Sequence, residues 1–304
     1  MTPFSVTALR AAELPGAAPT IGAIDAAVRA AKRAAPLNEA VWRDIEQPGP
    51  DSAGFLVGDR AYVHVARSDN FAPQHWAVGL ARTDDDDATL GALVDAAVDH
   101  VERHGGGRLV LWVSDAHPED DPPLAHVGFE PARDLYEMRV PLPIGLPIEF
   151  PPDITVRDFV PGRDEAAWLE VNNRAFANHP EQGGWIEATL ARRMADSWFD
   201  PSTFLLAFTA DRLAGFNWCK VHDAHGRDPA LGEIFVIGVD PDYAGKGLGR
   251  PLALAGLARL HERGLTTGSL FVAAENERAL RLYRGIGFTV HRVDRAYERE
   301  VEAA

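Results

Sequence analysis

The chain has 304 residues, of which 46% are hydrophobic and 25% charged, as is ordinary for a globular protein long enough for two domains. Its formal net charge of −15 disfavours a nucleic-acid-binding surface, and no apolar run approaches the roughly 18 residues of a membrane-spanning helix. Cys219 is the single cysteine, which excludes a disulfide framework, and the N-terminal segment lacks the pattern of a secretory signal, so we expect a cytoplasmic protein.

The first half contains a strand, Trp76 to Leu80, and a helix, Leu90 to Arg103, which are separated by four adjacent acids, Asp84 to Asp87. Further on, the segment from Pro141 to Asp153 is rich in proline and has little periodicity, which is typical of a linker. We therefore predict an N-terminal domain over residues 1–140, a linker over 141–153 and a C-terminal domain over 154–304.

The segment after the linker predicts two helices and a strand. Asn172 to Phe176 ends the first helix, His179 to Trp185 is a polar loop, and Ile186 to Ser197 is the second helix. Gly215 to His222 (GFNWCKVH) belongs to a predicted strand and includes the single cysteine. The polar loop and the lysine in this strand fit no simple structural need.

The most informative segment is a strand that runs directly into a glycine-rich loop. Ile234 to Val239 is a β-branched and aromatic run of strand length, which Pro241 ends because proline cannot donate to a sheet. Gly245, Gly247 and Gly249 follow at alternate positions. There the backbone can adopt positive φ and bring its N–H groups close to a ligand. Such a loop suits an anion.

The loop leads into a predicted helix that begins with Pro251 in its first turn and has Gly264 as its C-cap. A helix N-terminus favours phosphate, so the segment predicts a pyrophosphate site. The spacing matches neither the dinucleotide fingerprint nor the nucleoside-triphosphate loop, since Lys246 lies between glycines rather than after them. The alternative is a glycine-rich surface turn with no ligand.

The last part of the chain predicts a strand, Ser269 to Val272, a short helix that opens at Glu275 and a final strand. The order of these elements resembles the GCN5-related N-acetyltransferases (GNAT). The motifs that carry the resemblance are GKGLG (Gly245 to Gly249), Asn276, Ala279, Leu282 with Tyr283, and Gly287 with Phe288. In that family the loop holds the coenzyme A (CoA) pyrophosphate, the preceding strand pairs with the pantetheine arm, and the short helix lies beside the thioester.

The chain also resembles itself. A shift of 159 residues, from position 76 to position 235, lays the first strand over Phe235 to Val239 and the first helix over Gly249 to Glu262. Both halves end in a GF motif followed by a polar strand. Where the second half has its glycine-rich loop, the first has Asp84 to Asp87, and each pair of like charges disfavours a diphosphate by about 1 kcal/mol. We interpret the first domain as a degenerate acetyltransferase fold; the alternative is an independent enzyme with another cofactor.

Together these segments resemble the mycothiol acetyltransferase family, over most of the second domain and more thinly over the first. The resemblance implies an α/β (α+β) protein with two tandem GNAT domains, each a mixed, mainly antiparallel sheet flanked by helices. It implies acetyl transfer from acetyl-CoA to the cysteine amine of desacetylmycothiol, which gives mycothiol and CoA. We expect a monomer that acts on a small-molecule amine and uses no metal, nucleic acid or membrane.

The resemblance also implies the residues of the site. Substrate contacts fall on Glu39, Glu181, Lys220 and Glu233, and on Phe271, where the family has a tyrosine and this chain therefore lacks a hydroxyl donor. Acetyl-CoA contacts fall on Ile237, Gly238, Val239, Ala244, Gly245, Lys246, Gly247, Leu248, Gly249, Arg250, Asn276, Glu277, Arg278, Ala279, Leu280 and Arg281.

The chemistry assigns roles to three residues. A thioester is attacked only by a neutral amine, so Glu233 is the candidate base that takes a proton from the substrate ammonium. The backbone N–H of Val239 is the candidate donor to the oxygen on which negative charge develops. Tyr283 is the candidate proton donor to the departing thiolate. The alternatives are an exposed glutamate at a strand end and a tyrosine that only closes the core beneath Phe288.

Other functions remain open at this level. The fold could acetylate a different amine, such as an aminoglycoside, a polyamine or a protein N-terminus, and Phe271 favours that alternative. A non-catalytic acetyl-CoA sensor would keep the glycine-rich loop but need neither Glu233 nor Tyr283. His179, His222 and His225 suggest a zinc site, but no pair has the spacing of helical ligands and no cysteine accompanies them.

Overall fold

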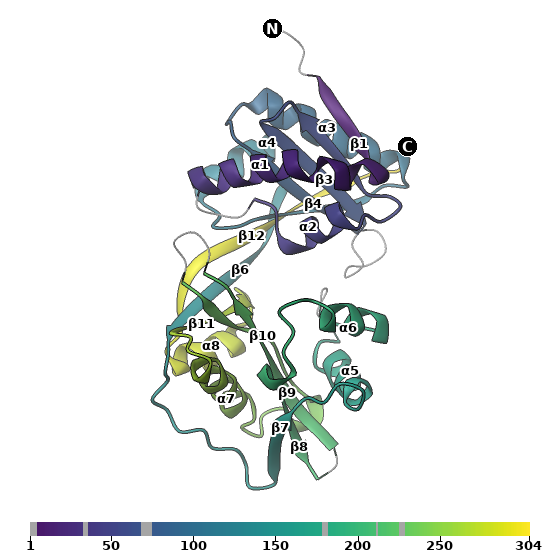
Figure 1. Cartoon of the computed structure of the whole chain (residues 1–304). Helices are drawn as coiled ribbons and strands as arrows, with labels where there is room; N and C mark the ends of the chain where they lie inside the picture. The colour runs from purple at the N-terminus through teal and green to yellow at the C-terminus, as the bar shows by residue number, and fades with distance from the viewer. Residues whose placement is uncertain (1–4, 33–35, 68–74, 178–181, 211, 225–228) are drawn as a thin grey trace. The chain divides into compact units, whose positions relative to one another are not determined.

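The chain forms two compact units in the computed structural model, which describes residues 5–32, 36–67, 75–177, 182–210, 212–224 and 229–304 (Figure 1). The first unit comprises Met1–Leu135 with Arg292–Ala304, and the second comprises Tyr136–His291. Each unit is a mixed sheet with helices on both faces.

The first unit has its own set of elements. Its strands are β1 (Val6–Arg10), β2 (Ala53–Val57), β3 (Ala61–Arg67), β4 (His75–Arg82) and β5 (Gly107–Val113). Its helices are η1 (Ala11–Glu13), α1 (Leu14–Lys32), α2 (Glu39–Glu46), α3 (Asp87–Arg103), η2 (Pro118–Asp120) and α4 (Asp121–His126). The sheet is antiparallel from β1 to β4, and β4 pairs with β5 in parallel.

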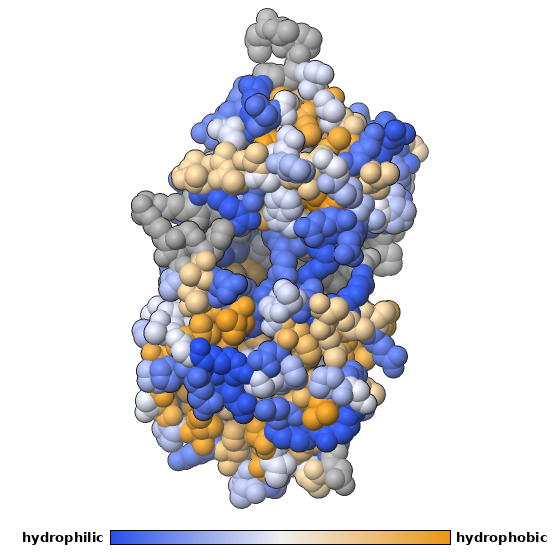
Figure 2. All heavy atoms as spheres, in the orientation of Figure 1, coloured by the Kyte–Doolittle hydropathy of each residue, from blue (hydrophilic) through white to orange (hydrophobic). Residues whose placement is uncertain are grey.

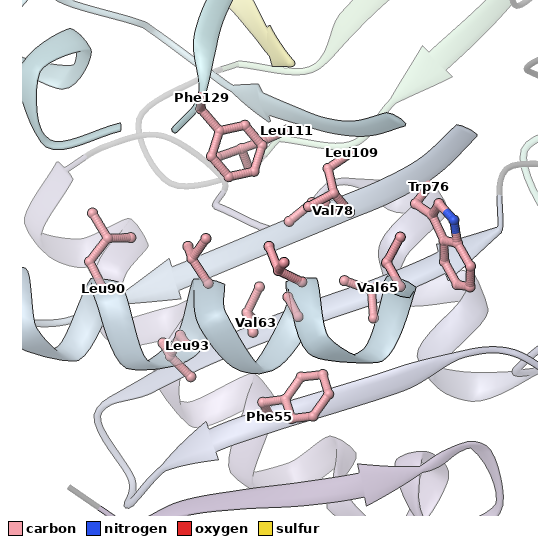
Figure 3. Packing of buried hydrophobic residues seen from close by; sticks show 14 of the residues in the cluster. Phe55, Val63, Val65, Trp76, Val78, Leu90, Leu93, Leu109, Leu111 and Phe129 are labelled. Atoms are coloured by element: carbon pink, nitrogen blue, oxygen red, sulfur yellow. The ribbon is translucent and has the colours of Figure 1, made fainter. Parts of the chain in front are cut away.

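Alternation along the strands of the first unit gives the sheet two apolar faces. Leu90 and Leu93 on α3 pack against one face, where Phe55 of β2 and Val63 of β3 meet them (Figure 3). Residues one position further along the strands, such as Leu56, belong to the opposite face, which α1 and α2 cover. Side chains of a strand alternate between the two faces of the sheet, and those of a helix return to the same face about every 3.6 residues. Both patterns place these apolar side chains in the core.

The second unit repeats this arrangement. Its strands are β7 (Ile154–Asp158), β8 (Phe204–Thr209), β9 (Arg212–His222), β10 (Leu231–Val239) and β11 (Thr267–Ala273). Its helices are α5 (Glu165–Ala175), α6 (Glu187–Met194), η3 (Pro201–Thr203), η4 (Pro241–Tyr243), α7 (Gly249–Glu262) and α8 (Glu277–Ile286). Strands β7 to β10 are antiparallel, and β10 pairs with β11 in parallel.

The two faces of the second sheet carry different helices (Figure 1). Trp168 of α5 packs with Trp218 of β9 and Val236 of β10 on one face. Ile234 packs with Leu257 of α7 on the other face, which α8 also covers. Neighbouring residues of β10 therefore point to opposite sides of the sheet, one toward α5 and α6 and the other toward α7 and α8.

Two long strands, β6 (Glu130–Pro141) and β12 (Thr289–Val301), each run from one unit into the other. Val140 of β6 is buried in the core of the second unit, whereas Tyr297 of β12 is buried in the core of the first. The pairing of Arg295–Val301 with β5 explains the second placement. The predicted C-terminal domain, residues 154–304, therefore differs from the second compact unit, Tyr136–His291. The sequence predicts that each half ends in its own final strand, whereas the end of β6 belongs to the second unit and most of β12 to the first.

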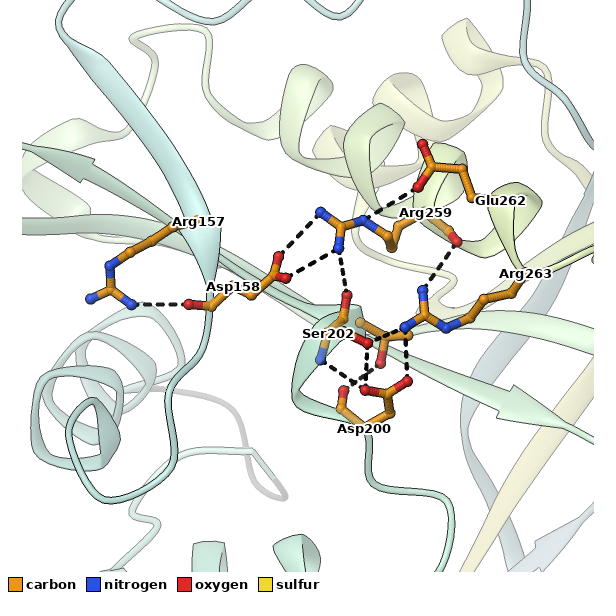
Figure 4. Close-up of polar contacts among 8 residues, drawn as sticks. Arg157, Asp158, Asp200, Ser202, Arg259, Glu262 and Arg263 are labelled. Atoms are coloured by element: carbon orange, nitrogen blue, oxygen red, sulfur yellow. Dashed lines mark hydrogen bonds and ion pairs between the residues drawn. The ribbon is translucent and has the colours of Figure 1, made fainter.

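Partly exposed ion pairs hold the C-terminal end of helix α7 (Figure 4). The Arg259 guanidinium lies 3.1 Å from Asp158 of β7 and also donates to the backbone oxygen of Ser202 at 3.0 Å. Arg263 pairs with Asp200 at 2.8 Å, just before η3. These contacts tie the last turn of α7 to β7 and η3, which fixes the direction of the helix and so the position of its N-terminus.

Most predicted elements are present with shifted ends. The second helix before β8 is shorter than predicted, Glu187–Met194 rather than 186–197, because Ala195 and the residues after it turn toward η3. Helix α7 begins at Gly249 rather than near Pro251, so this glycine is helical, and of the three glycines of the loop only Gly245 and Gly247 have positive φ. Gly264 follows the helix with φ +84°, which confirms its predicted capping role.

The visible surface of both units mixes hydrophilic and hydrophobic residues in small areas (Figure 2). Large hydrophobic side chains exposed in the described ranges include Ile186 and Phe271. Within those ranges no helix is long and apolar enough to cross a membrane.

Candidate active site

The glycine-rich loop of the second unit is open where a ligand would lie. Gly245 and Gly247 have φ of +78° and +84°, a conformation that costs other residues about 1–2 kcal/mol. A Cβ added at either position would meet no described atom within 4 Å. The N-cap residue of α7 is Leu248, and no side chain of the described residues caps the helix there. The first N–H groups of α7 are therefore available to an anion.

Two arginines hold the start of this loop. Asp240, which is buried, caps η4 by accepting a hydrogen bond from the backbone N–H of Asp242. Arg174 of α5 lies 3.3 Å from Asp240 and 3.1 Å from Asp242, and Arg212 of β9 lies 2.5 Å from Asp242. Lys246 turns back over the ring of Tyr243, with its Nζ 4.8 Å from the centroid. The loop thus leaves the sheet in a fixed direction and presents one lysine.

Strands β10 and β11 part just before the loop. Their register runs from Gly232 opposite Gly268 to Ile234 opposite Leu270 and extends no further between these two described strands. The rest of β10, which includes Ile237, Gly238 and Val239, faces the gap that opens beside β11. Backbone groups at the edge of an unpaired strand are what an extended amide chain pairs with.

The loop, the parted strands and α8 come together. A Cβ on Gly249 would lie 3.6 Å from Leu282 of α8, and Arg250 reaches within 3.6 Å of the same construction on Gly285. The residues predicted to contact acetyl-CoA on α8, Glu277 to Arg281, form the first turns of this helix. Asn276 is its N-cap, and its side chain accepts a hydrogen bond from the N–H of Ala279 at 3.1 Å. The start of α7 therefore contacts the second half of α8, and the predicted cofactor residues lie on the end of β10, on the loop and start of α7, and on the first turns of α8.

A β-bulge separates this region from a cluster of charged residues. In the pairing of β9 with β10, Glu233 lies opposite Lys220 and Ile234 opposite Cys219, but Val236 lies opposite Trp218. Phe235 is therefore the extra residue. A bulge re-aims the side chains beside it and is common next to active sites. Here it falls between Glu233 and the parted segment of β10.

Glu233 is buried, so the alternative of an exposed glutamate at a strand end is wrong. Its Oε2 lies 2.5 Å from Nε2 of His222, the last residue of β9. The side chain of Glu233 is 10% exposed and that of His222 is 37% exposed. Lys220, Glu233 and His222 alternate along two paired strands and point to the same face, the one covered by α5 and α6.

Aromatic rings hold Lys220 in this cluster. Its Nζ lies 4.7 Å from the ring centroid of Trp198 and 6.0 Å from that of Phe235. The rings of Trp198 and Phe235 meet edge to face at 5.1 Å. A cation over aromatic faces is stabilised by about 0.5–2 kcal/mol, so this buried lysine is fixed beside Glu233 rather than facing solvent. A lysine on a strand usually faces solvent, but Lys220 is buried.

Tyr283 lies on the other side of the sheet, in the core between α7 and α8. Its ring packs edge to face on Phe288 at 5.7 Å, the contact that the structural alternative predicted. Burial raises the pKa of Tyr283 to about 12, which keeps the phenol protonated at neutral pH. Tyr283 is therefore available as a hydrogen-bond donor.

The remaining predicted residues are placed separately. Phe271 is on β11 and is partly exposed, as a ligand-contacting ring would be. Glu39 belongs to the first unit, as the first residue of α2, where it pairs with Arg43 at 3.2 Å. Glu181 and the histidines at 179 and 225 lie outside the described residues. In the described ranges no three His, Cys, Asp or Glu side chains are grouped to hold a metal ion.

Two members of the charged cluster were not predicted from the sequence. His222 entered only as the last residue of the GFNWCKVH strand and as a metal candidate, and Trp198 was not singled out. The alternation of Lys220 and His222 along one strand, with Glu233 on the next, was the signal that could have found the histidine. No local signal pointed to the tryptophan, because it comes from the segment after α6.

The matching helix of the first unit is capped by the chain itself. Asp86 is the N-cap of α3 and accepts hydrogen bonds from the N–H and Oγ1 of Thr89 at 3.1 and 2.8 Å. Asp84 accepts a hydrogen bond from the N–H of Asp86 and pairs with Arg60 at 3.5 Å. The hydrogen bonds from Thr89 lower the pKa of Asp86, so it stays ionised. A carboxylate occupies the anion position here.

A cavity of about 560 Å³ lies beside that helix, where β4 and β5 part. Its lining includes the apolar Leu80, Leu111 and Val113, one arginine, and four acids, Asp85, Asp115, Glu119 and Asp120. The first unit therefore keeps the parted strands of the fold but surrounds them with negative charge.

Comparison with known proteins agrees with this geometry. Residues 167–288 match the Acetyltransferase (GNAT) family. The chain is 41% identical over 300 residues to the mycothiol acetyltransferase of Thermobispora bispora, an alignment that covers 94% of this chain and 97% of that protein.

Solved structures share the fold over nearly the whole chain. A GCN5-related N-acetyltransferase from Sphaerobacter thermophilus matches 98% of this chain and 96% of its own, with a TM-score of 0.74 and 24% identity. A tandem GNAT protein from the clavulanic acid biosynthesis pathway matches 99% of both chains, with a TM-score of 0.69 and 16% identity. The predicted pair of mixed, mainly antiparallel sheets flanked by helices is confirmed.

Proposed function

The chain belongs to the mycothiol acetyltransferases, within the GNAT family, and we propose that it acetylates the cysteine amine of desacetylmycothiol with acetyl-CoA. As a member of this family it is an N-acetyltransferase. The observation that carries the proposal for this chain's own chemistry is the buried Glu233 carboxylate, which lies next to the bulge and the parted strands. A buried carboxylate at that position can act as the general base that removes a proton from an amine.

The open loop is where the proposal places the pyrophosphate of acetyl-CoA. The N–H groups of Gly245 and of Gly247 to Arg250 would surround the phosphates, and the Lys246 side chain would add a positive charge. The edge of β10 from Ile237 to Val239 would pair with the pantetheine arm. The first turns of α8, Asn276 to Arg281, would close the other side. The co-substrate supplies the acetyl thioester.

Three groups of this chain then act on the reaction. The Glu233 carboxylate takes a proton from the substrate ammonium, so that the nitrogen can attack the thioester carbon. The N–H of Val239 stabilises the carbonyl oxygen as its negative charge grows. Tyr283 donates a hydrogen bond to the sulfur, which leaves with the C–S bond electrons. Of the two protons lost by the ammonium, one is balanced by the thiol of CoA and the other reaches solvent.

The acceptor would be held by charged residues around Glu233. Lys220 is fixed beside it by Trp198 and supplies a donor for hydroxyl or amide oxygens. Glu39 and Glu181 are proposed to contact the same acceptor, as the family pattern implies. Phe271 offers only a ring where the family has a tyrosine. An acetyltransferase for another small amine is the second candidate, and the missing hydroxyl at Phe271 is the feature that favours it.

Mass spectrometry of the products tests the proposal. The purified protein is incubated with acetyl-CoA and desacetylmycothiol, with spermidine and an aminoglycoside as parallel acceptors. We expect a product about 42 Da heavier from desacetylmycothiol, and a much lower kcat/KM for the other amines. Preference for another amine would overturn the acceptor, and binding of acetyl-CoA without any product would favour a sensor. A Phe271→Tyr variant measures what the hydroxyl contributes.

A further inference from the structure

We propose that His222 is a positioning residue for the base Glu233, holding one carboxylate oxygen so that the other faces the acceptor amine. The inference rests on the proposed role of Glu233. It concerns a residue to which the sequence analysis assigned no role in acetyl transfer. The histidine lies at the end of β9, two residues after Lys220 and on the same face.

The contact joins a buried group to an accessible one. His222 Nε2 lies 2.5 Å from Glu233 Oε2. The carboxylate is 10% exposed, whereas the imidazole is 37% exposed. An ionised carboxylate carries no proton, so Nε2–H is the donor and Oε2 the acceptor. A hydrogen bond to a charged acceptor is short and about twice as strong as a neutral one.

The geometry leaves Oε1 for the reaction. A glutamate has three rotatable bonds, and a base works only within hydrogen-bonding distance of the proton that it takes. With Oε2 held by His222, rotation of the carboxylate is restricted, and the proposal assigns Oε1 to the acceptor amine. Lys220 lies opposite Glu233 on the neighbouring strand, with its ammonium over the ring of Trp198. The short contact of the imidazole with Oε2 is the one that we propose orients the carboxylate.

Two substitutions at the same position separate the hydrogen bond from the fold. His222→Ala removes the donor, and we expect kcat to fall about 10- to 100-fold, as the loss of a hydrogen bond to a charge predicts, with the KM for acetyl-CoA unchanged. His222→Gln places an amide N–H near the former Nε2, so most of the activity should remain. Added imidazole should restore part of the activity of His222→Ala, since the site of the ring is accessible.

The matched control is His291→Ala, which removes an exposed histidine of β12 and should leave kcat unchanged. A His222→Ala enzyme within twofold of the wild type would overturn the proposal. The proposal would also be overturned if His222→Gln were as slow as His222→Ala and imidazole did not restore His222→Ala. The loss of activity would then not depend on the presence of a hydrogen-bond donor. Circular dichroism identifies any variant that fails to fold. If His222→Ala is folded, restoration of its activity by imidazole supports the proposal, and no restoration counts against it.

A second readout needs no turnover and so separates this inference from the choice of acceptor. Nitrogen-15 NMR of the histidine side chains, in the full chain without ligands, should show a hydrogen-bonded Nε2 for His222. That signal should shift in Glu233→Gln and stay unchanged in Lys246→Ala. An unchanged signal in Glu233→Gln would overturn the contact. If the wild type acetylates an amine other than desacetylmycothiol, the proposed acceptor fails while the kinetic test proceeds on that amine.

Discussion

The N-termini of α3 and α7 occupy matching places in the two units but end differently. Helix α3 is capped by Asp86, whose carboxylate accepts hydrogen bonds from the backbone and side chain of Thr89. Helix α7 begins after two glycines with positive φ, and in the described structure no side chain caps it. One fold thus presents a helix end filled by its own anion and another helix end open to a foreign one.

The difference indicates that the capacity of this helix end to bind an anion depends on a few residues rather than on the fold. Both units keep parallel strands that part near the same helix, β4 and β5 in one and β10 and β11 in the other. Among the residues that the structure describes, only those of the second unit combine the open helix end with a buried glutamate next to a bulge. We therefore place both the cofactor and the chemistry in the second unit.

The largest expected effect comes from the base. Glu233→Gln removes the proton acceptor of the second unit and should lower kcat by about 10²- to 10⁴-fold, because general base catalysis contributes that much. Acetyl-CoA should still bind with the wild-type Kd, since the carboxylate lies on the face of the sheet away from α7. Steady-state kinetics and calorimetry measure the two quantities. A variant that keeps a tenth or more of the wild-type kcat would place the base elsewhere and break the assignment to this unit.

The next effect tests the glycine-rich loop against an equivalent glycine at the far end of the same helix. Gly247→Ala and Gly264→Ala both force a side chain into φ +84°, and neither added Cβ meets a described atom within 4 Å. Both should destabilise the protein by about 1–2 kcal/mol. Only Gly247→Ala should also weaken acetyl-CoA binding, by about tenfold or more, because the loop N–H groups turn away. Equal Kd values for the two variants would argue against a phosphate site at this loop.

A smaller effect tests the self-capped helix. Asp86→Ala removes the N-cap of α3 and should lower Tm by about 2–4 °C at pH 7, while Asp87→Ala, one residue later, should change it less. Thr89 lowers the pKa of Asp86 in the folded protein, so the stabilisation is complete above the unfolded pKa of about 3.9. It is lost as the pH falls through the lower folded value.

Thermal unfolding of both variants across the pH range checks this prediction. The difference in Tm between Asp86→Ala and the wild type should be constant near neutrality and shrink below about pH 4. A difference that persists in acid would mean that the carboxylate does not cap α3 through its charge.

Much of the second unit could be predicted from the sequence. The strand before Pro241 and the turns at Gly245 and Gly247 are local features, fixed by proline and glycine geometry, and they match β10 and its loop. Gly249 was the exception, because a glycine at a helix start gives no sign of whether its φ is helical. The internal repeat also located α3, whose last residue, Arg103, corresponds to Glu262 at the end of α7.

The parts that could not be predicted depend on long-range pairing. The exchange of β6 and β12 between the units is decided by which core buries Val140 and Tyr297, and both halves carry similar final strands. The contact between His222 and Glu233 depends on the register of two strands with a bulge nearby. Periodicity gives the face of a residue but not its partner across the sheet.

Calorimetric titration of the full chain with acetyl-CoA tests the comparison most directly. The account predicts one molecule bound per chain, at the open end of α7, and no binding above the noise when Gly245 and Gly247 are both replaced by Asp, as in the acidic run of the first unit. Two molecules bound per chain, or unchanged binding by the double variant, would contradict the claim that only the second unit holds the cofactor.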